Sequence, residues 1–158
     1  MIYTPMTNKA IKLMYEAHKD QVDKSGIPYV FHPWHVAESM QDEKRCTVAL
    51  LHDVIEDTDM TLESLKKEGF PDDVMEAIDK LTHKDGMDYA EYIRTIAEND
   101  LAMDVKIADL MHNMDKTRTL GENKISKIKY ELYQSSYNYL LRVKKIKEDK
   151  KAFYRQIK

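Results

Sequence analysis

Apolar residues recur at intervals of three and four along most of this chain, a spacing that favours helices over strands. One such stripe follows the helix-start signal Thr4-Pro5 and consists of Ala10, Leu13, Met14 and Ala17. No segment alternates apolar and polar residues as a half-buried strand would. Only four glycines and four prolines interrupt the 158 residues, which argues against disorder and turn-rich β folds. We therefore predict an all-α protein, built as one compact helical-bundle domain over residues 1–158.

Glycine, proline and helix-capping residues divide this domain into segments. After the N-terminal helix, we expect a loop over 23–28, a break at Gly121, and helices over about 33–44, 45–55, 61–69, 71–81, 88–98, 101–115 and 124–147. The segment 45–55 is apolar almost all round, so it should form the buried central helix. Its Cys46 is the only cysteine in the chain, so we expect a small buried side chain and no disulfide.

Charge and hydropathy exclude several partners. The formal net charge is −3, whereas nucleic-acid-binding domains are usually basic, so we expect no nucleic-acid partner. No apolar run is long enough for a signal peptide or a membrane span, so we expect a cytoplasmic protein with no membrane partner. The basic segment 142–158 is interpreted as a solvated helix face, with a docking tail as the alternative. A stripe of the last helix is expected to be core rather than a dimer face, and consists of Tyr130, Tyr133, Tyr137, Leu140 and Leu141.

The segment HDVIEDT, at the end of the predicted central helix, concentrates ionisable side chains in an apolar setting. On a continuous helix Glu56 would lie one turn after His52, and Asp57 one turn after Asp53. Burying an imidazole and three carboxylates is costly unless a cation or hydrogen bonds compensate. This arrangement indicates a divalent metal ion, while an exposed acidic helix end with a satisfied core histidine is the alternative.

A second segment, VKIADLMHN, places Asp109 on a predicted helix. Val105, Ala108 and Met111 are expected to form its inward stripe, with Asp109 beside them. A charged side chain on that flank needs a partner, although an exposed aspartate is the more common explanation of such a segment. Asn113 lies one turn later, where it could bind a ligand or cap the helix.

A third segment, YVFHPWH, presents His32 immediately before a proline that can start a helix. His35 is expected to face elsewhere, and His18, His83 and His112 have no predicted role. Two histidines and two aspartates then make a mixed nitrogen and oxygen ligand set that suits Mn²⁺ or Fe²⁺ better than a closed structural zinc site. The candidate metal ligands are His32, His52, Asp53 and Asp109.

These motifs resemble a known family. The order His, His-Asp, Asp is that of the HD phosphohydrolase superfamily. More narrowly, AHKDQVDKSGIPYVFHP, LLHDVIEDT and VKIADLMHNM are similar to the hydrolase domain of the Rel/Spo alarmone enzymes and to the small alarmone hydrolases. The similarity covers about residues 10 to 120 and implies an HD-type helical bundle. It also implies a nucleotide substrate and removal of the 3′-pyrophosphate from ppGpp or pppGpp, giving GDP or GTP.

The resemblance also assigns roles. His32, His52, Asp53 and Asp109 match the metal ligands of the family, with Mn²⁺ as the usual ion. Glu56 and Asp57 match the carboxylates that assist the attack of water. The residues that match substrate-contacting positions are Lys24, Ser25, Asn113 and Tyr133, and the match of Tyr133 is a loose one.

Two positions depart from the family pattern. The family commonly has arginine where this chain has Asp23, and often has arginine where it has Asp115. A carboxylate cannot perform the role of a guanidinium, although Arg118 could compensate. Lys24, Lys106 and Arg118 could neutralise substrate phosphates. Hydrolysis of another nucleotide phosphoester or pyrophosphate therefore remains an alternative, as does a non-catalytic domain that binds metal or nucleotide.

Overall fold

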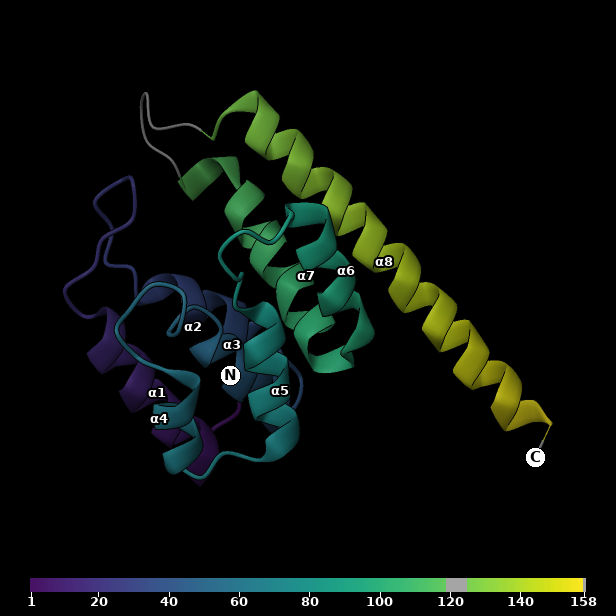
Figure 1. Cartoon of the computed structure of the whole chain (residues 1–158), viewed down its shortest axis with the longest axis horizontal. Helices are drawn as coiled ribbons and strands as arrows, with labels where there is room; N and C mark the ends of the chain where they lie inside the picture. The colour runs from purple at the N-terminus through teal and green to yellow at the C-terminus, as the bar shows by residue number, and fades with distance from the viewer. Residues whose placement is uncertain (119–124, 158) are drawn as a thin grey trace.

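The computed structural model describes residues 1–118 and 125–157. In this part of the chain there is no strand, and the prediction of an all-α fold is confirmed (Figure 1). The helices are α1 (Pro5–His18), α2 (Phe31–Glu38), α3 (Glu43–Leu51), α4 (Leu62–Lys67), α5 (Asp72–Leu81), α6 (Tyr89–Glu98), α7 (Asp100–Met114), the short 3-10 helix η1 (Lys116–Arg118) and α8 (Lys127–Gln156).

Polar side chains cap most of these helices where the sequence supplies them. Thr4 forms a capping box with Thr7 at the start of α1. Asn99 ends α6 and also caps α7, because its side chain accepts hydrogen bonds from the first backbone amides of α7. Such caps satisfy amide groups that have no partner within the helix. The sharp corner between α6 and α7 is therefore encoded locally.

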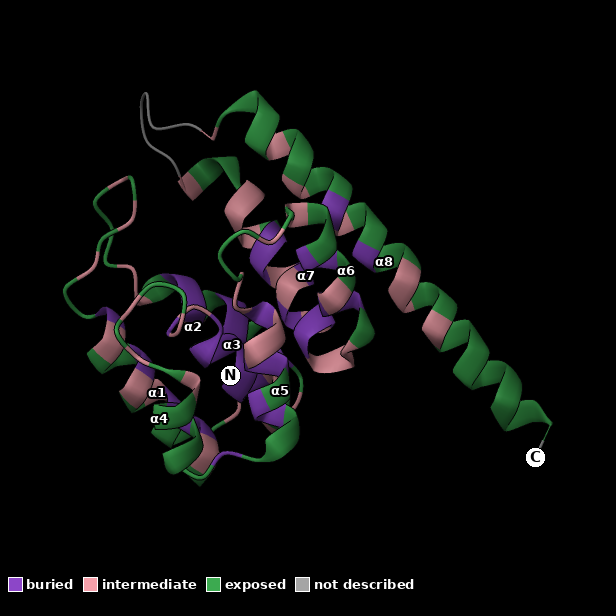
Figure 2. Ribbon diagram, viewed as in Figure 1, coloured by how far each residue is buried: buried purple, intermediate pink, exposed green. Residues whose placement is uncertain are grey.

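The core surrounds α3, which packs against α1, α2, α5 and α7. Every residue from Cys46 to Leu51 is buried, as predicted for the central helix, and buried positions concentrate in the middle of the bundle (Figure 2). Cys46 is a free buried thiol, which confirms the prediction for that residue. Because α3 is enclosed, the residues at its C-terminal end are held deep in the molecule.

The predicted bounds of the second and third helices were wrong. The helix expected over 33–44 ends at Glu38, and α3 begins at Glu43 because Asp42 accepts a hydrogen bond from the Arg45 amide. α3 also ends at Leu51 rather than at residue 55, and residues 52–57 form turns. The side chains of the HDVIEDT segment are therefore arranged by a turn and do not stack along a continuous helix.

The predicted inward stripe of α7 was also partly wrong. Val105 is fully buried, but Met111 is 54% exposed. The inward positions include Ile107, Asp109 and Leu110 instead. The reason is that α7 packs against α2, α3 and α5 as well as against α6 and α8, so neighbours cover more than one face of this helix. Asp109 is consequently buried within the core.

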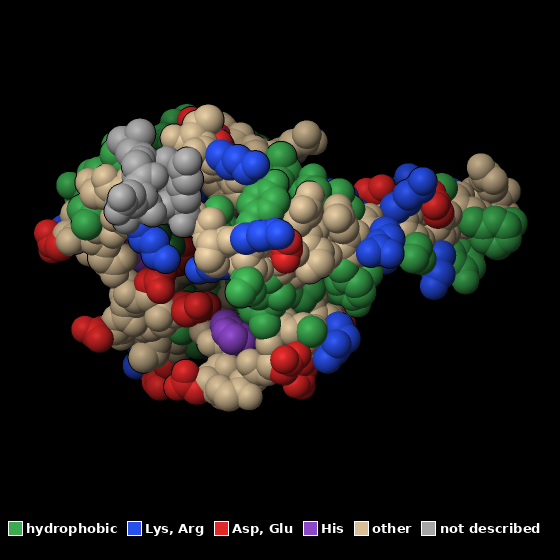
Figure 3. Space-filling model, turned by 90° about the horizontal axis from the view of Figure 1, so that it is seen from above, with side chains coloured by type: hydrophobic (Ala, Val, Ile, Leu, Met, Phe, Trp, Pro, Cys, Tyr) green, Lys and Arg blue, Asp and Glu red, His purple; other side chains and the backbone are tan. Residues whose placement is uncertain are grey.

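α8 lies along α6 and α7, and its C-terminal end projects beyond the bundle (Figures 1 and 3). The expected break at Gly121 and the expected start at Lys124 fall outside the described residues. The expected end near residue 147 was wrong, because α8 continues to Gln156. The predicted core stripe is only partly buried, because Leu140 is enclosed while Leu141 is 38% exposed. No described helix has both the length and the apolar composition needed to cross a membrane.

Candidate metal centre

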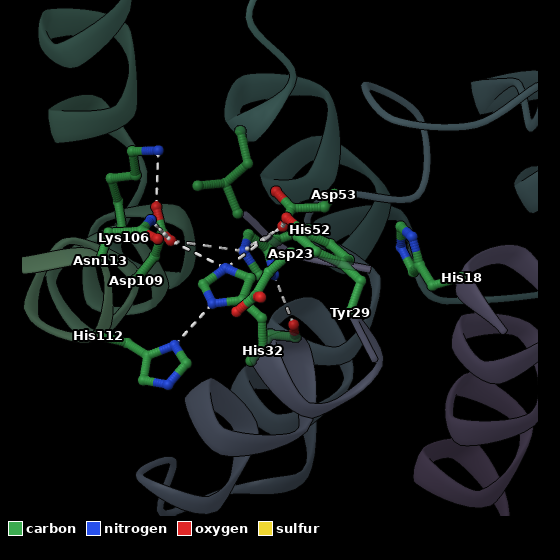
Figure 4. A network of polar contacts seen from close by, with 12 residues as sticks. His18, Asp23, Tyr29, His32, His52, Asp53, Lys106, Asp109, His112 and Asn113 are labelled. Atoms are coloured by element: carbon green, nitrogen blue, oxygen red, sulfur yellow. Dashed lines mark hydrogen bonds and ion pairs between the residues drawn. The ribbon is translucent and has the colours of Figure 1, made fainter. Parts of the chain in front are cut away.

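The four predicted metal ligands lie close together in the middle of the bundle, although up to 77 residues separate them in the sequence (His32 to Asp109) (Figure 4). His32 is in the first turn of α2, the pair His52-Asp53 directly follows α3, and Asp109 is on α7. One ligand atom from each of His32, His52 and Asp109 lies within 4.8 Å of the others. Contacts between α2, α3 and α7 bring these side chains together.

Asp53 completes the cluster from the side. Its Oδ2 atom lies 3.1 Å from Nε2 of His52 and 3.4 Å from Nε2 of His32. Asp109 Oδ1 lies 3.2 Å from Nε2 of His32 and 3.8 Å from Nε2 of His52. Neighbouring ligand atoms bound at about 2.1 Å to one ion are about 3 to 3.5 Å apart. Three of the four separations are of this size, so His32, His52 and Asp109 fit a single cation, and Asp53 lies beside both imidazoles.

The orientation of His52 shows that a positive charge is needed at this point. Its Nδ1 donates to the backbone oxygen of Ala49 at 2.7 Å, so in the neutral ring Nε2 carries a lone pair. That Nε2 is buried and makes no hydrogen bond within the described chain, although two carboxylates face it. Lone pairs and carboxylates repel one another unless a proton or metal ion lies between them. The donor set therefore fits a divalent cation.

The close approach of imidazoles and carboxylates also shifts the pKa values of the cluster. Burial opposes charge on His52, but Asp53 and Asp109 outweigh that effect and raise its pKa. The pKa of His32 is likewise raised by these carboxylates against burial. In return, despite burial, the imidazoles and Lys106 hold the pKa of the two aspartates well below the usual range. The carboxylates are thus ionised and attract a cation.

Neighbouring polar groups fix the two carboxylates. The Tyr29 hydroxyl donates to Asp53 Oδ2 at 2.6 Å, and burial followed by the charge of Asp53 raises the pKa of that tyrosine. The Asn113 side chain donates to Asp109 Oδ1. Nζ of Lys106 lies 2.8 Å from Asp109 Oδ2, and the Lys106 side chain is 14% exposed. Hydrogen bonds from residues that do not bind the metal themselves orient metal ligands and restrict their motion.

A second histidine pair, which the sequence did not indicate, adjoins the cluster. Nδ1 of His112 lies 2.7 Å from Nδ1 of His32, and the His35 ring stacks on His112 with the ring centroids 4.4 Å apart. His35 does not join the ligand cluster, because its side chain is 64% exposed, but its ring packs on His112. The spacing of three between His32 and His35, and between Asp109 and His112, places each pair on one helix face and could have indicated this.

A cavity of about 630 Å³ opens above the cluster. It is lined by His32, Asp53 and Asp109, whereas His52 is buried and is not part of the lining. The other predicted site residues also line it, from the catalytic pair to the substrate contacts: Glu56, Asp57, Lys24, Ser25, Asn113 and Tyr133. All ten residues singled out in the sequence therefore belong to one region of the molecule.

The two carboxylates at the cavity rim differ in environment. Glu56 accepts a hydrogen bond from the backbone amide of His83 at 3.0 Å, which holds it in place. Burial and the nearby charge of Asp53 raise the pKa of Asp57. A raised pKa brings the Asp57 carboxylate closer to the range of a general base near neutral pH.

The two departures from the family pattern, Asp23 and Asp115, also face the cavity. Asp23 Oδ1 accepts hydrogen bonds from the amides of Ser25 and Ile27 at 2.8 and 3.0 Å, so this carboxylate shapes its own loop. Its Oδ2 lies 3.6 Å from Nη2 of Arg118. Arg118 Nη1 donates to Asn113 Oδ1 at 3.2 Å. A guanidinium is therefore present on the cavity wall, supplied by η1.

Comparisons with known proteins agree with this geometry. A profile of the family described as HD domain matches residues 10–135. The chain is 37% identical over 139 residues to the guanosine-3′,5′-bis(diphosphate) 3′-pyrophosphohydrolase of Haemophilus influenzae, a match covering 75% of this chain and 20% of that protein. It is 33% identical over 132 residues to a probable GTP pyrophosphokinase of Mycobacterium leprae, covering 75% of this chain and 17% of that protein. The match thus spans about a fifth of these relatives or less.

A solved structure shares the fold. It is described as a metazoan ortholog of SpoT that hydrolyses ppGpp and plays a role in starvation responses. The TM-score is 0.69 at 24% identity, and the match covers 90% of this chain and 87% of that one. The two proteins therefore share this helical arrangement over nearly the whole of both chains.

Proposed function

The chain belongs to the HD domain family, and from that premise we propose that it is a divalent-metal-dependent phosphohydrolase. Its proposed substrates are guanosine-3′,5′-bis(diphosphate) and the corresponding pentaphosphate, which water cleaves to GDP or GTP and pyrophosphate. The observation that carries this proposal is the convergence of His32, His52 and Asp109 within 4.8 Å, with Asp53 beside them, under an open cavity. A closed structural site would have no such opening.

The proposed ligands are the two histidines and two aspartates of the cluster, and Mn²⁺ is the ion we propose because mixed nitrogen and oxygen ligands suit it. Bound there, a divalent ion would lower the pKa of water and polarise a phosphoryl oxygen. Asp57, with its raised pKa, would accept the proton of the attacking water. Glu56, held by the His83 amide, would orient that water.

The cavity can accommodate a nucleotide, since binding pockets for small molecules are usually about 300 to 1,000 Å³. Its lining contains six carboxylates and four basic side chains, so a polyphosphate would be repelled without a bound cation. The basic groups that we propose for the phosphates are Lys24, Arg118 and Lys106. Ser25, Asn113 and Tyr133 would contact the rest of the nucleotide.

A second candidate is hydrolysis of a different nucleotide phosphoester or pyrophosphate. The observation that favours it is the presence of Asp23 and Asp115 on the cavity wall. Both carboxylates accept hydrogen bonds from neighbouring residues, Asp23 from its loop amides and Asp115 from Thr117. They would change which base or sugar edge can be recognised, but they leave the metal cluster intact.

A nucleotide panel separates these candidates. The purified chain would be analysed for bound metal and assayed with Mn²⁺ against guanine and adenine nucleotides, with phosphate and pyrophosphate measured separately. We expect pyrophosphate from ppGpp and pppGpp. Release from another nucleotide alone would favour the second candidate, and an absence of both metal and turnover would refute hydrolase function.

Two variants identify the site responsible. Asp53→Ala should lose metal binding and hydrolysis together, because it removes a ligand that contacts both histidines. Asp59→Ala is the matched control, since Asp59 is exposed and lies outside the cavity lining. Full activity in Asp53→Ala would show that the hydrolysis takes place elsewhere or arises from a contaminant.

A further inference from the structure

His112 lies beside the metal cluster but outside the proposed ligand set. Its Nδ1 is 2.7 Å from Nδ1 of His32 (Figure 4). The two ring planes differ by only 15°, and their centroids are 4.9 Å apart. Two rings stacked face to face could not bring a pair of nitrogens to 2.7 Å without overlap, whereas coplanar rings joined at their edges can. The contact is therefore an in-plane hydrogen bond.

The surroundings of His32 fix the direction of this hydrogen bond. Its Nε2 faces Asp53 and Asp109 at 3.4 and 3.2 Å, so Nε2 is the nitrogen available to an ion. In an imidazole that binds a metal through Nε2, the proton is on Nδ1. Nδ1 of His32 must then donate, and Nδ1 of His112 must accept.

His112 is itself held from two sides. The His35 ring covers one of its faces, with the planes 24° apart. Nη1 of Arg118 donates to the backbone oxygen of His112 at 3.1 Å. The acceptor nitrogen thus has a position set by α2, α7 and η1 together. A fixed acceptor of this kind selects one tautomer and one ring angle of the histidine that it contacts.

We propose that His112 is a positioning residue, which accepts the hydrogen bond from His32 Nδ1 and thereby holds His32 Nε2 toward the metal position. This inference rests on the proposed function, because it concerns the same metal centre. It assigns His112 no contact with substrate. Its consequence is that the affinity for metal depends on a side chain that does not bind the metal.

Metal affinity, measured by titration calorimetry with Mn²⁺, is the first test. His112→Leu keeps a branched side chain but has no acceptor, and we expect binding 10- to 100-fold weaker. His112→Asn has the same branching and can place an oxygen where Nδ1 stood, so we expect most of the affinity to return. His35→Phe keeps a ring over His112 and is the control, with an affinity close to that of the wild type.

The nitrogen chemical shifts of the histidine rings, recorded by NMR on the metal-free protein, are the second test. We expect a proton on Nδ1 of His32 and none on Nδ1 of His112. A protonated Nδ1 on His112 would overturn the proposal, as would equal Mn²⁺ affinities of wild type and His112→Leu. A wild-type protein that binds no divalent ion would refute the proposed function instead, and with it the effect on affinity.

Discussion

The ion pair between the half-buried Lys106 and the buried Asp109 predicts an unequal response to removal of either charge. The Lys106 ammonium lies 2.8 Å from the Asp109 carboxylate, and the two side chains are 14% and 4% exposed. Asp109 has further partners in Asn113 and the two histidines. The ammonium also lies over the face of the Tyr92 ring, 5.3 Å from its centroid. The Lys106 ammonium therefore depends on this ion pair for its compensation more than the Asp109 carboxylate does.

The magnitudes follow from that difference. Asp109→Asn leaves a buried ammonium without its counter-charge, which costs about 3 to 5 kcal/mol of unfolding free energy. Lys106→Met removes one charged hydrogen bond from a carboxylate that keeps its other partners, and should cost about 1.5 to 3 kcal/mol. The double variant leaves no unpaired ammonium. Its loss of unfolding free energy should therefore be smaller than the sum of the two single losses by about 1 kcal/mol or more.

Urea unfolding followed by circular dichroism, with a chelator and with Mn²⁺, measures these values. At a metal concentration of about 100 times the dissociation constant, the wild type should gain about 2.7 kcal/mol. Lys106→Met should gain a similar amount of unfolding free energy from Mn²⁺, whereas Asp109→Asn should gain almost nothing. Asp109→Asn with the stability of the wild type in chelator, or with an equal gain from Mn²⁺, would show that Lys106 does not depend on this carboxylate or that Asp109 does not bind the metal.

Three further outcomes are expected. Tyr29→Phe loses the hydrogen bond to Asp53, so calorimetry should show Mn²⁺ binding about tenfold weaker or more; unchanged affinity would contradict this. Glu56→Gln should retain metal but lose most of its turnover in steady-state assays, and full activity would exclude Glu56 from the mechanism. Hydrogen bonds from two lysines of α8 lower the pKa of Asp100 to about 2. Because this pKa is lower in the folded state, the stabilisation is complete above the unfolded value of about 3.9 and is lost as pH falls toward 2. The carboxylate is 40% exposed, so the effect on urea midpoints should be below about 1 kcal/mol, and Asp100→Asn should abolish it.

The sequence was sufficient for the helical class and for the identity of the central helix. Both depend on local properties, because the apolar spacing that makes a segment amphipathic or fully apolar is read within a few turns. The residues from Cys46 to Leu51 illustrate this, since each of them is buried as their composition predicts. The candidate site residues also came from the sequence, through motifs in a recognisable order, although their roles remain predictions.

Helix ends and exposed faces were less accessible to sequence reasoning. The chain leaves α3 at Leu51, and Met111 of α7 is exposed. Periodicity cannot give these results, because the end of a helix and the width of its buried face depend on which neighbours cover it. In α7, helices on several sides enclose Asp109 and leave Met111 in solvent.

The contacts around the site were decided by tertiary structure alone. The sequence determined that this chain would form helices and would carry two histidines and two aspartates suited to a metal. Only packing of α2 against α3 and α7 brought these four together and set His112 against His32, across 80 positions of the chain. The physical reason is that helix formation is governed by residues three and four apart, whereas a ligand cluster requires side chains from separate helices to meet around one point.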